Sequence, residues 1–222
     1  MFFDFAKYDL MTYLNTKFPH YKYAVINKEI FPAVVSRTGE KYCIHPDLIT
    51  YLQSREQYSV EGLKSSDLVI DLGANIGAFS FRCAKFGCKV HAFEPLEYMA
   101  LWKNIQLNDL FDVVIPHHDA LGNGDTIDVE WRGKKQTMPT RTFTYIKKIC
   151  GGCDFLKCDV EGAEWFIHPD ELQDVRRIEM EFHMFSPYAN KSKIQAYDQY
   201  FDMEFRDLKG ETLWYSGTNK HI

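Results

Sequence analysis

Apolar and polar positions along this chain of 222 residues follow two alternating periods. From residue 67 onward, short apolar runs typical of buried strands alternate with segments whose apolar residues recur every three or four positions, as on one face of a helix. The expected strands are LVIDL, KVHAFE, DVVIPHH, DFLKCDV and RRIEMEFH, with helices ending near Gly87, following Pro95 and following DFLKCDV. This alternation predicts parallel strands joined by crossover helices in an open α/β sheet.

Two segments depart from the alternation. TIDVEWR and TMPTRTF flank a Gly-Lys-Lys turn between the third and fourth strands, and the C-terminal YFDMEFRDLKGETLWYSG turns at Lys209 and Gly210. Alternating strands on either side of a glycine-containing turn predict a β-hairpin in both places.

The first 60 residues lack this pattern, and we expect them to form an N-terminal extension to a domain of residues 61–222. Apolar residues at helical spacing predict an amphipathic helix over residues 2–18. The other elements expected there are two short strands, at residues 23–26 and Ala33–Val35, and a helix that begins near His45.

The charge of the chain narrows the classes of partner. A formal net charge of -5 argues against a nucleic-acid surface, which needs clustered Lys and Arg, and favours a cationic ligand. No uncharged apolar run approaches the roughly 18 to 20 residues that cross a bilayer, and the N-terminus lacks the features of a signal peptide. We therefore expect a cytoplasmic protein that contacts no membrane.

Six cysteines are scattered through the predicted strands and helices, which favours free thiols over disulfides. Cys150 and Cys153 form a single CxxC pair. A structural zinc usually takes four protein ligands, and no second pair follows at zinc spacing. We therefore expect no metal site.

The glycine-rich loop after the first predicted strand carries the first chemical signal. It resembles the dinucleotide fingerprint GxGxxG, but Asn75 replaces the middle glycine, which would let the backbone approach a pyrophosphate. Asp71, at the end of the strand, would also place a negative charge near an anionic cofactor. Both departures favour a ligand without phosphates, such as S-adenosyl-L-methionine, which carries a sulfonium.

Acidic residues follow three successive strands: Asp71, then Glu94 after 23 residues, then Asp119. The carboxyl ends of parallel strands meet at one edge of the sheet, where ligands of such sheets bind. Together the three carboxylates would form a cradle for a cationic nucleoside, with Glu94 accepting the ribose hydroxyls. Taken singly, they could instead be a helix cap, a surface charge and a turn residue.

In the order VIDLGANIGAFS, VHAFEP, NIQLN, FLKCDVEGAE and IEMEFH, residues 64–216 resemble the FkbM-type methyltransferases, a branch of the class I S-adenosylmethionine-dependent enzymes. The resemblance implies a three-layer, Rossmann-like sheet of seven strands, mostly parallel, with an antiparallel C-terminal pair. It also implies methyl transfer, commonly to a hydroxyl of a small metabolite or sugar. The cofactor residues that it implies are Asp71, Gly73, Ala74, Asn75 and Gly77 near the methionine, Glu94 at the ribose, and Asp119 with Ala120 at the adenine. Asn104 and Asn108, in the helix after Glu94, also match the family pattern. They are either binding residues or solvent-exposed positions of that helix.

Charged residues interrupt two of the central strands, which should be apolar on both faces. In the fourth strand, Lys157 lies on one face, and we expect it to pair with Glu179 or Glu181 of the fifth strand, because a lone buried ammonium would cost several kcal/mol. The remaining charged positions, Asp159 and His183, lie nearer the strand ends.

Three residues at these strand ends are candidates for catalysis, beside the expected methyl donor: His183, Asp159 and Glu161. His183 is the first candidate for the base that removes the proton of the acceptor hydroxyl, because its ordinary pKa is near 6.5, and Asp159 is the second. His183 could equally be a hydrogen-bonded residue at a strand end. A less favoured alternative is a divalent ion bound by Asp159, Glu161 and Glu181.

The leading hypothesis is therefore an S-adenosylmethionine-dependent O-methyltransferase that acts on a small molecule or glycan, not on nucleic acid. An NAD-dependent dehydrogenase and a non-catalytic cofactor-binding protein are the alternatives, and homodimer formation stays open. Because the first helix has no counterpart in the family, we expect Phe3, Phe5 and Tyr8 to close over the acceptor.

Overall fold

The computed structural model describes residues 33–36, 39–43, 57–131 and 133–222. The helix expected at residues 2–18 with its three aromatic residues, the strand expected at residues 23–26 and the helix expected from His45 lie outside the described residues. Within the described part of the chain, no helix is both long and apolar enough to cross a bilayer.

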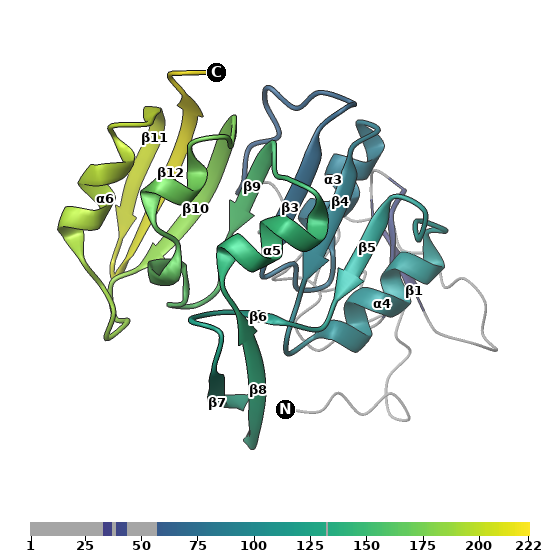
Figure 1. The fold of residues 1–222 in the computed structure, drawn as a ribbon. Coiled ribbons are helices and arrows are strands. Elements are labelled where there is room, and N and C mark those ends of the chain that lie inside the picture. Colours follow the sequence, from purple (N-terminus) through teal and green to yellow (C-terminus); the bar gives the residue numbers. More distant parts are fainter. Residues whose placement is uncertain (1–32, 37–38, 44–56, 132) are drawn as a thin grey trace.

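A seven-stranded sheet forms the centre of the fold (Figure 1). In spatial order its strands are β11 (Phe201–Lys209), β12 (Thr212–Asn219), β10 (Arg177–His183), β9 (Phe155–Cys158), β3 (Leu68–Leu72), β4 (Lys89–Phe93) and β5 (Val114–His117). Only β12 runs antiparallel to its neighbours β10 and β11, whereas the other pairs are parallel. The predicted mostly parallel sheet with an antiparallel C-terminal hairpin is confirmed.

Helices cover both faces of the sheet. Figure 1 shows α3 (Ala78–Lys85) and α4 (Tyr98–Leu107) on one face, and α5 (Phe143–Cys150) and α6 (Lys191–Tyr197) on the other. Each face has its own apolar cluster, in which Phe81 and Leu101 pack with one side of the strands and Phe143 and Tyr197 pack with the other. The molecule therefore has three layers, as expected.

One predicted helix is wrong, and one helix was not predicted. The helix expected after DFLKCDV is wrong, because the segment forms two short 3-10 helices, η1 (Glu164–Phe166) and η2 (Pro169–Leu172). Pro169 has no N–H and disfavours helical geometry in the residue before it, so a continuous helix cannot form. In contrast, α5 begins within the expected hairpin strand, because the side chain of Thr142 accepts a hydrogen bond from the Tyr145 N–H and caps the helix.

Small sheets flank the central one. The hairpin predicted between the third and fourth strands is confirmed as β7 (Thr126–Trp131) and β8 (Lys134–Arg141). A short strand, β6 (Ala120–Leu121), pairs with β8 and completes this small sheet. The strand predicted at Ala33–Val35 is confirmed as β1, which pairs with β2 (Lys41–Cys43).

Asn104 and Asn108, on α4, attach β2 to the body of the fold. The side-chain oxygen of Asn104 accepts from Cys43 N at 2.6 Å, and its amide donates to Ile76 O at 2.9 Å. Asn108 accepts from Lys41 N at 2.8 Å in the same way. Asn104 is fully buried, so the expectation of an exposed helix position is wrong for this residue, and neither side chain lines the cavity described below.

A buried ion pair joins β3 to β9. Lys157 stands in register with Asp71 on one side and Glu179 on the other, and its Nζ lies 3.3 Å from Asp71 Oδ1. The same ammonium donates to the carbonyls of Leu72 at 3.2 Å and Gly73 at 2.7 Å. Burial disfavours the charged amine, but the carboxylates of Asp71 and Asp159 outweigh it and raise the pKa of Lys157. The pairing expected with Glu179 or Glu181 is therefore wrong.

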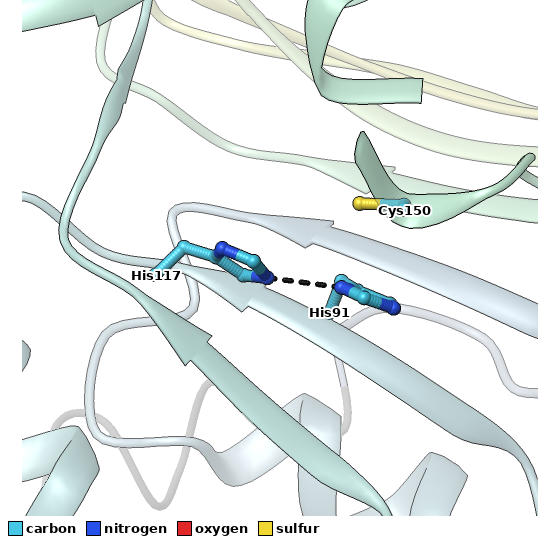
Figure 2. A group of neighbouring side chains, drawn as sticks. All are labelled: His91, His117 and Cys150. Atoms are coloured by element: carbon cyan, nitrogen blue, oxygen red, sulfur yellow. Dashed lines mark hydrogen bonds between the residues drawn. The ribbon is translucent and has the colours of Figure 1, made fainter. Parts of the chain in front are cut away.

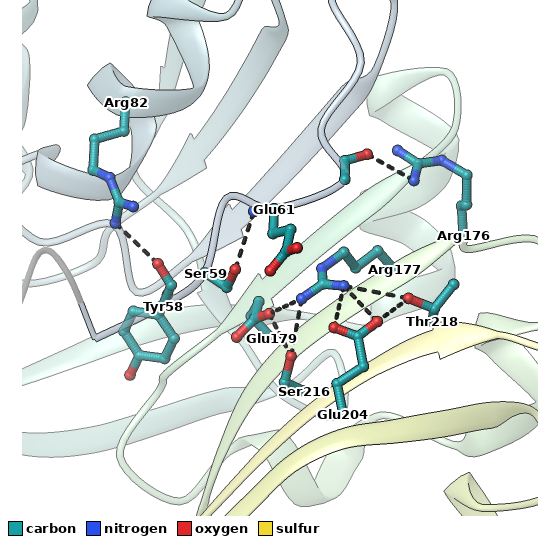
Figure 3. A network of polar contacts seen from close by, with 11 residues as sticks. Tyr58, Ser59, Glu61, Arg82, Arg176, Arg177, Glu179, Glu204, Ser216 and Thr218 are labelled. Carbon is teal, nitrogen blue, oxygen red and sulfur yellow. Dashed lines mark hydrogen bonds and ion pairs between the residues drawn. The ribbon is translucent and has the colours of Figure 1, made fainter.

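Glu179 and Glu181 have other partners, and Figure 3 shows those of Glu179. Glu179 pairs with Arg177 at 2.8 Å and accepts from the hydroxyl of Ser216 at 2.6 Å. Glu181 accepts from the hydroxyl of Tyr58 at 2.5 Å. Arg177 also contacts Glu204 at 2.6 Å, and residues 58–61 lie beside this network. The charged side chains of β10 thus find their partners in ion pairs and in the segment before β3, and no apolar layer of the described residues covers them.

Replacing Lys157 by methionine should leave the Asp71 carboxylate buried without its ion-pair partner, and should lower the free energy of unfolding by about 3–5 kcal/mol. The double variant Asp71→Leu/Lys157→Met removes both charges and should recover most of that loss. Denaturant unfolding of both variants checks this. Lys89→Met, at an exposed position of β4, is the matched control and should change stability by less than about 0.5 kcal/mol. A single Lys157→Met variant as stable as the control would contradict the assignment.

Candidate active site

A cavity of about 370 Å³ lies at the carboxyl ends of β3, β4 and β9. Its volume falls within the range of small-molecule sites. Leu72, Phe93 and Asp159 line it from the sheet, and the β7–β8 hairpin adds Val129 and Met138. The hairpin that interrupts the parallel sheet therefore forms one wall of this cavity.

The cavity lining is acidic. It contains the carboxylates of Glu94, Glu97, Asp119, Asp159 and Glu161, and no lysine, arginine or histidine of the described residues. The remaining lining is mostly apolar, which keeps the local dielectric low and strengthens the field of these charges. The arrangement attracts a cation and repels a phosphate.

The glycine-rich loop forms the floor of the cavity. Gly73 has a φ of 74°, and a Cβ at this position would lie 1.7 Å from the carbonyl oxygen of Asp159, so only glycine fits between β3 and β9 here. Asn75 also has a positive φ, of 52°, and its side-chain oxygen is buried without a hydrogen-bond partner among the described residues. The loop therefore contains an acceptor that no described residue satisfies.

Glu94 joins two loops at the cavity. Its carboxylate accepts from the backbone N–H of Asn75 at 2.8 Å, of Leu96 at 2.7 Å and of Glu97 at 2.8 Å. Burial raises the pKa of Glu94, and the three N–H groups oppose that rise. A carboxylate offers about four acceptor positions, so roughly one remains for a ligand.

Side chains of the hairpin donate hydrogen bonds to Asp119 and Glu97. Arg141 Nε donates to Asp119 Oδ1 at 3.0 Å, and the indole N–H of Trp131 donates to Glu97 at 2.9 Å. Both donors come from β8 or β7. The hairpin thus fixes the carboxylates as well as forming the wall.

The structure brings most of the sequence-predicted site residues to the cavity. Those in the lining are Gly73, Asn75, Glu94, Asp119, Ala120, Asp159 and Glu161. The predicted residues outside the lining are Asp71, Ala74, Gly77 and His183. Asp71 lies beneath the loop, where it accepts from the hydroxyl of Ser80 at 2.6 Å and pairs with Lys157.

His183 lies behind the cavity, among carboxylates. Its Nδ1 is 3.3 Å from Glu164 Oε1, and its Nε2 is 3.5 Å from Glu161 Oε2 and 3.9 Å from Glu181 Oε1. Burial favours the neutral ring, but the carboxylates of Glu164, Glu161 and Asp159 outweigh it and raise the pKa of His183 to about 9. At neutral pH the imidazole therefore carries a proton, which does not suit a general base.

Sequence reasoning missed Glu164. This fully buried carboxylate accepts from the backbone N–H of Gly162 at 2.8 Å and of His183 at 2.5 Å. It is the last residue of the EGAE stretch, and the available signal was a second glutamate followed directly by the apolar residues Trp165 and Phe166. The alternative prediction was a divalent ion bound by Asp159, Glu161 and Glu181. In the structure, the residues with ligand atoms within 4.8 Å of one another are Asp159, Glu161 and His183. Glu181 instead accepts hydrogen bonds from Gln57 and Tyr58.

The charge on His183 predicts a specific pH dependence of stability. Because its folded pKa of about 9 exceeds the unfolded value, the protonated ring stabilises the fold fully below about pH 6.5, and this is lost as the pH rises through 9. The stability of the wild type relative to His183→Gln should fall by roughly 3 kcal/mol over that window. Denaturant unfolding at several pH values measures it. His221→Gln, near the exposed C-terminus, serves as the control. A difference that does not vary with pH would mean that the ring is neutral.

The sequence matches the model of the Methyltransferase FkbM domain over residues 71–209. This chain belongs to the FkbM methyltransferase family. The matched range contains the glycine-rich loop, all five cavity carboxylates, Glu164 and His183. No curated protein sequence matches the chain significantly.

One solved structure of low sequence identity shares the fold of this FkbM-family chain, and two others are less similar to it. The fibrillarin pre-rRNA processing protein of Methanococcus jannaschii is 11% identical, with a TM-score of 0.52, over 91% of this chain and 89% of that one. TYW2 of P. horikoshii, in complex with MeSAdo, is 14% identical (TM-score 0.47; 86% and 71% covered). The tRNA m1G37 methyltransferase of M. jannaschii is 18% identical (TM-score 0.48; 86% and 55% covered). At these identities the likeness concerns the fold alone.

Proposed function

We propose that this FkbM-family chain is an S-adenosylmethionine-dependent O-methyltransferase that acts on a hydroxyl of a small metabolite or glycan. The observation that carries the proposal is the cavity lining, which holds five carboxylates and, among the described residues, no basic side chain. Such a lining opposes the pyrophosphate of a nicotinamide dinucleotide and suits a sulfonium nucleoside.

The cavity residues fit this cofactor. The unpartnered oxygen of Asn75 would accept from the amino group of the methionine part, beside the bare backbone of Gly73. The remaining acceptor position of Glu94 would take a ribose hydroxyl, and Asp119 would accept from the adenine amino group. When bound, the cofactor supplies an electrophilic methyl group on its sulfonium.

Asp159 is the best-placed base among the three catalytic candidates. It lines the cavity, whereas His183 is charged and lies behind it. Burial, followed by the carboxylates of Asp159 and Glu181, raises the pKa of Tyr58 well above its ordinary value, so this phenol keeps its proton and donates a hydrogen bond to Glu181. In this proposal Asp159 accepts the proton of the acceptor hydroxyl, and Glu161, fixed by the imidazolium of His183, orients that hydroxyl.

The acceptor would enter between aromatic residues. Phe166, Phe185 and Tyr188 line the cavity on the side of Glu161, and the last two are more than half exposed. Aromatic faces pack well against the apolar faces of sugars and of ring systems. Alignment of the acceptor oxygen with the methyl group in such a site accounts for up to about 7–11 kcal/mol of rate enhancement in well-oriented reactions.

Calorimetric titration separates this proposal from a dehydrogenase. We expect S-adenosylmethionine to bind and NAD to show no heat of binding. Glu94→Gln should weaken cofactor binding about 10- to 100-fold, because hydrogen bonds to a charged group contribute about 1.5–3 kcal/mol. Glu130→Gln, at an exposed position of β7, is the matched control. Binding of NAD in preference to S-adenosylmethionine would refute the proposal.

Asp159→Asn should lower turnover by about 10²- to 10⁴-fold, because it removes a positioned base while keeping the shape of the side chain. Its affinity for S-adenosylmethionine should stay within a few-fold of the wild type. Transfer of label from methyl-labelled S-adenosylmethionine to components of a cell extract measures turnover and also identifies the acceptor. Cofactor binding without label transfer by the wild type would instead indicate a non-catalytic binding protein.

A further inference from the structure

His91 on β4, His117 on β5 and Cys150 at the end of α5 form a cluster outside the cavity lining (Figure 2). One ring nitrogen of each histidine and the sulfur of Cys150 lie within 4.8 Å of one another. Figure 2 shows the three side chains gathered between the strands and the helix. The CxxC pair noted in the sequence thus contributes one thiol to a group with two imidazoles.

The two histidines share one proton. His91 Nδ1 lies 2.9 Å from His117 Nε2, and the rings are stacked with centroids 5.2 Å apart. A contact this short between two ring nitrogens requires one of them to be a lone pair, because two N–H groups would repel. At least one imidazole is therefore neutral, which is the form that binds metals.

The cluster is incomplete as a hydrogen-bonded group. His91 is 5% exposed, and its Nε2 is buried without a hydrogen-bond partner among the described residues. A buried polar atom left without a partner costs about 1–3 kcal/mol, so such an atom needs a reason. Cys150 is also buried, with its sulfur beside the imidazoles and no disulfide partner.

We propose that His91, His117 and Cys150 bind one Zn²⁺ ion. Two imidazole nitrogens and one thiolate are ligands that zinc prefers, and three protein ligands with an open fourth position are common in zinc sites. Zinc bonds of about 2.0–2.3 Å place neighbouring ligand atoms roughly 3.4–3.6 Å apart. Zinc binding releases the thiol proton of Cys150, and each neutral imidazole binds through one ring nitrogen and keeps its proton on the other.

The cluster lies where three elements of the fold meet, close to the cavity wall. The ring of His117 stacks on Phe93 with centroids 4.2 Å apart, and Phe93 lines the cavity. His117 is half-buried, so an ion can enter from the surface. An ion at this cluster joins β4, β5 and α5 behind the cavity wall. The proposal does not depend on the identity of the cofactor or of the methyl acceptor.

Metal binding by the full-length protein, purified with a chelator and kept reduced, tests the site. Zinc titration should give one bound ion per chain, and cobalt should give the thiolate-to-metal charge-transfer absorption that an oxygen and nitrogen site lacks. Cys150→Ser and His91→Ala should each weaken zinc binding more than about 10- to 100-fold, since changes even to outer-shell residues cost that much. Cys150→Ser should also abolish the cobalt band, because it removes the thiolate.

Cys153→Ser is the matched control, because Cys153 is equally buried and belongs to the same CxxC pair but not to the cluster. It should bind zinc like the wild type, and zinc should raise the Tm of both. If Cys150→Ser does not fold, His117→Ala, at a half-buried position, replaces it. Absence of stoichiometric zinc binding by the wild type, or zinc binding unchanged by Cys150→Ser, would overturn the proposal.

Discussion

The buried ion pair between Asp71 and Lys157 is the interaction on which the cavity depends. Lys157 crosses from β9 to β3, neutralises Asp71 and binds the carbonyls of Leu72 and Gly73 with the same ammonium. Two charges taken out of water are tolerated only when they pair well and satisfy their remaining hydrogen bonds. The pair therefore fixes the direction of the glycine-rich loop, and Gly73 can approach the backbone of Asp159 because it has no side chain.

Three carboxylates that line the cavity above the glycine-rich loop accept hydrogen bonds from groups in the cavity walls. Backbone N–H groups hold Glu94, Arg141 holds Asp119, and Trp131 holds Glu97. Each donor orients its carboxylate without placing a basic group in the lining. The field inside the cavity consequently remains negative, although every one of these three carboxylates is hydrogen-bonded.

Histidines in this molecule show how the surroundings decide the charge. Burial lowers the pKa of His91 to about 4, with smaller effects of His117 and Lys89 in the same direction. His183 is also buried, but three carboxylates outweigh the burial and raise its pKa to about 9. The same residue type is thus neutral beside a second imidazole and cationic beside the active-site acids.

The sequence by itself determined which segments form the parallel strands, both hairpins and the acidic edge of the sheet. Hydrophobic period and turn residues are local properties, and the carboxyl ends of parallel strands must meet at one edge. For this reason the sequence alone assigns Glu94, Asp119 and Asp159 to one region. Asp71 was assigned there as well, but it lies beneath the glycine-rich loop, outside the cavity lining, and pairs with Lys157.

Only the tertiary structure decided which charges pair and which side chains gather. Lys157 has an acid in register on each side, and the choice between Asp71 and Glu179 depends on Arg177 and Ser216, which satisfy Glu179. The protonation of His183 and the meeting of His91 with Cys150 likewise depend on distances and burial between elements remote along the chain. Local periodicity carries no such information, because it states which face a residue occupies and not what lies opposite that face.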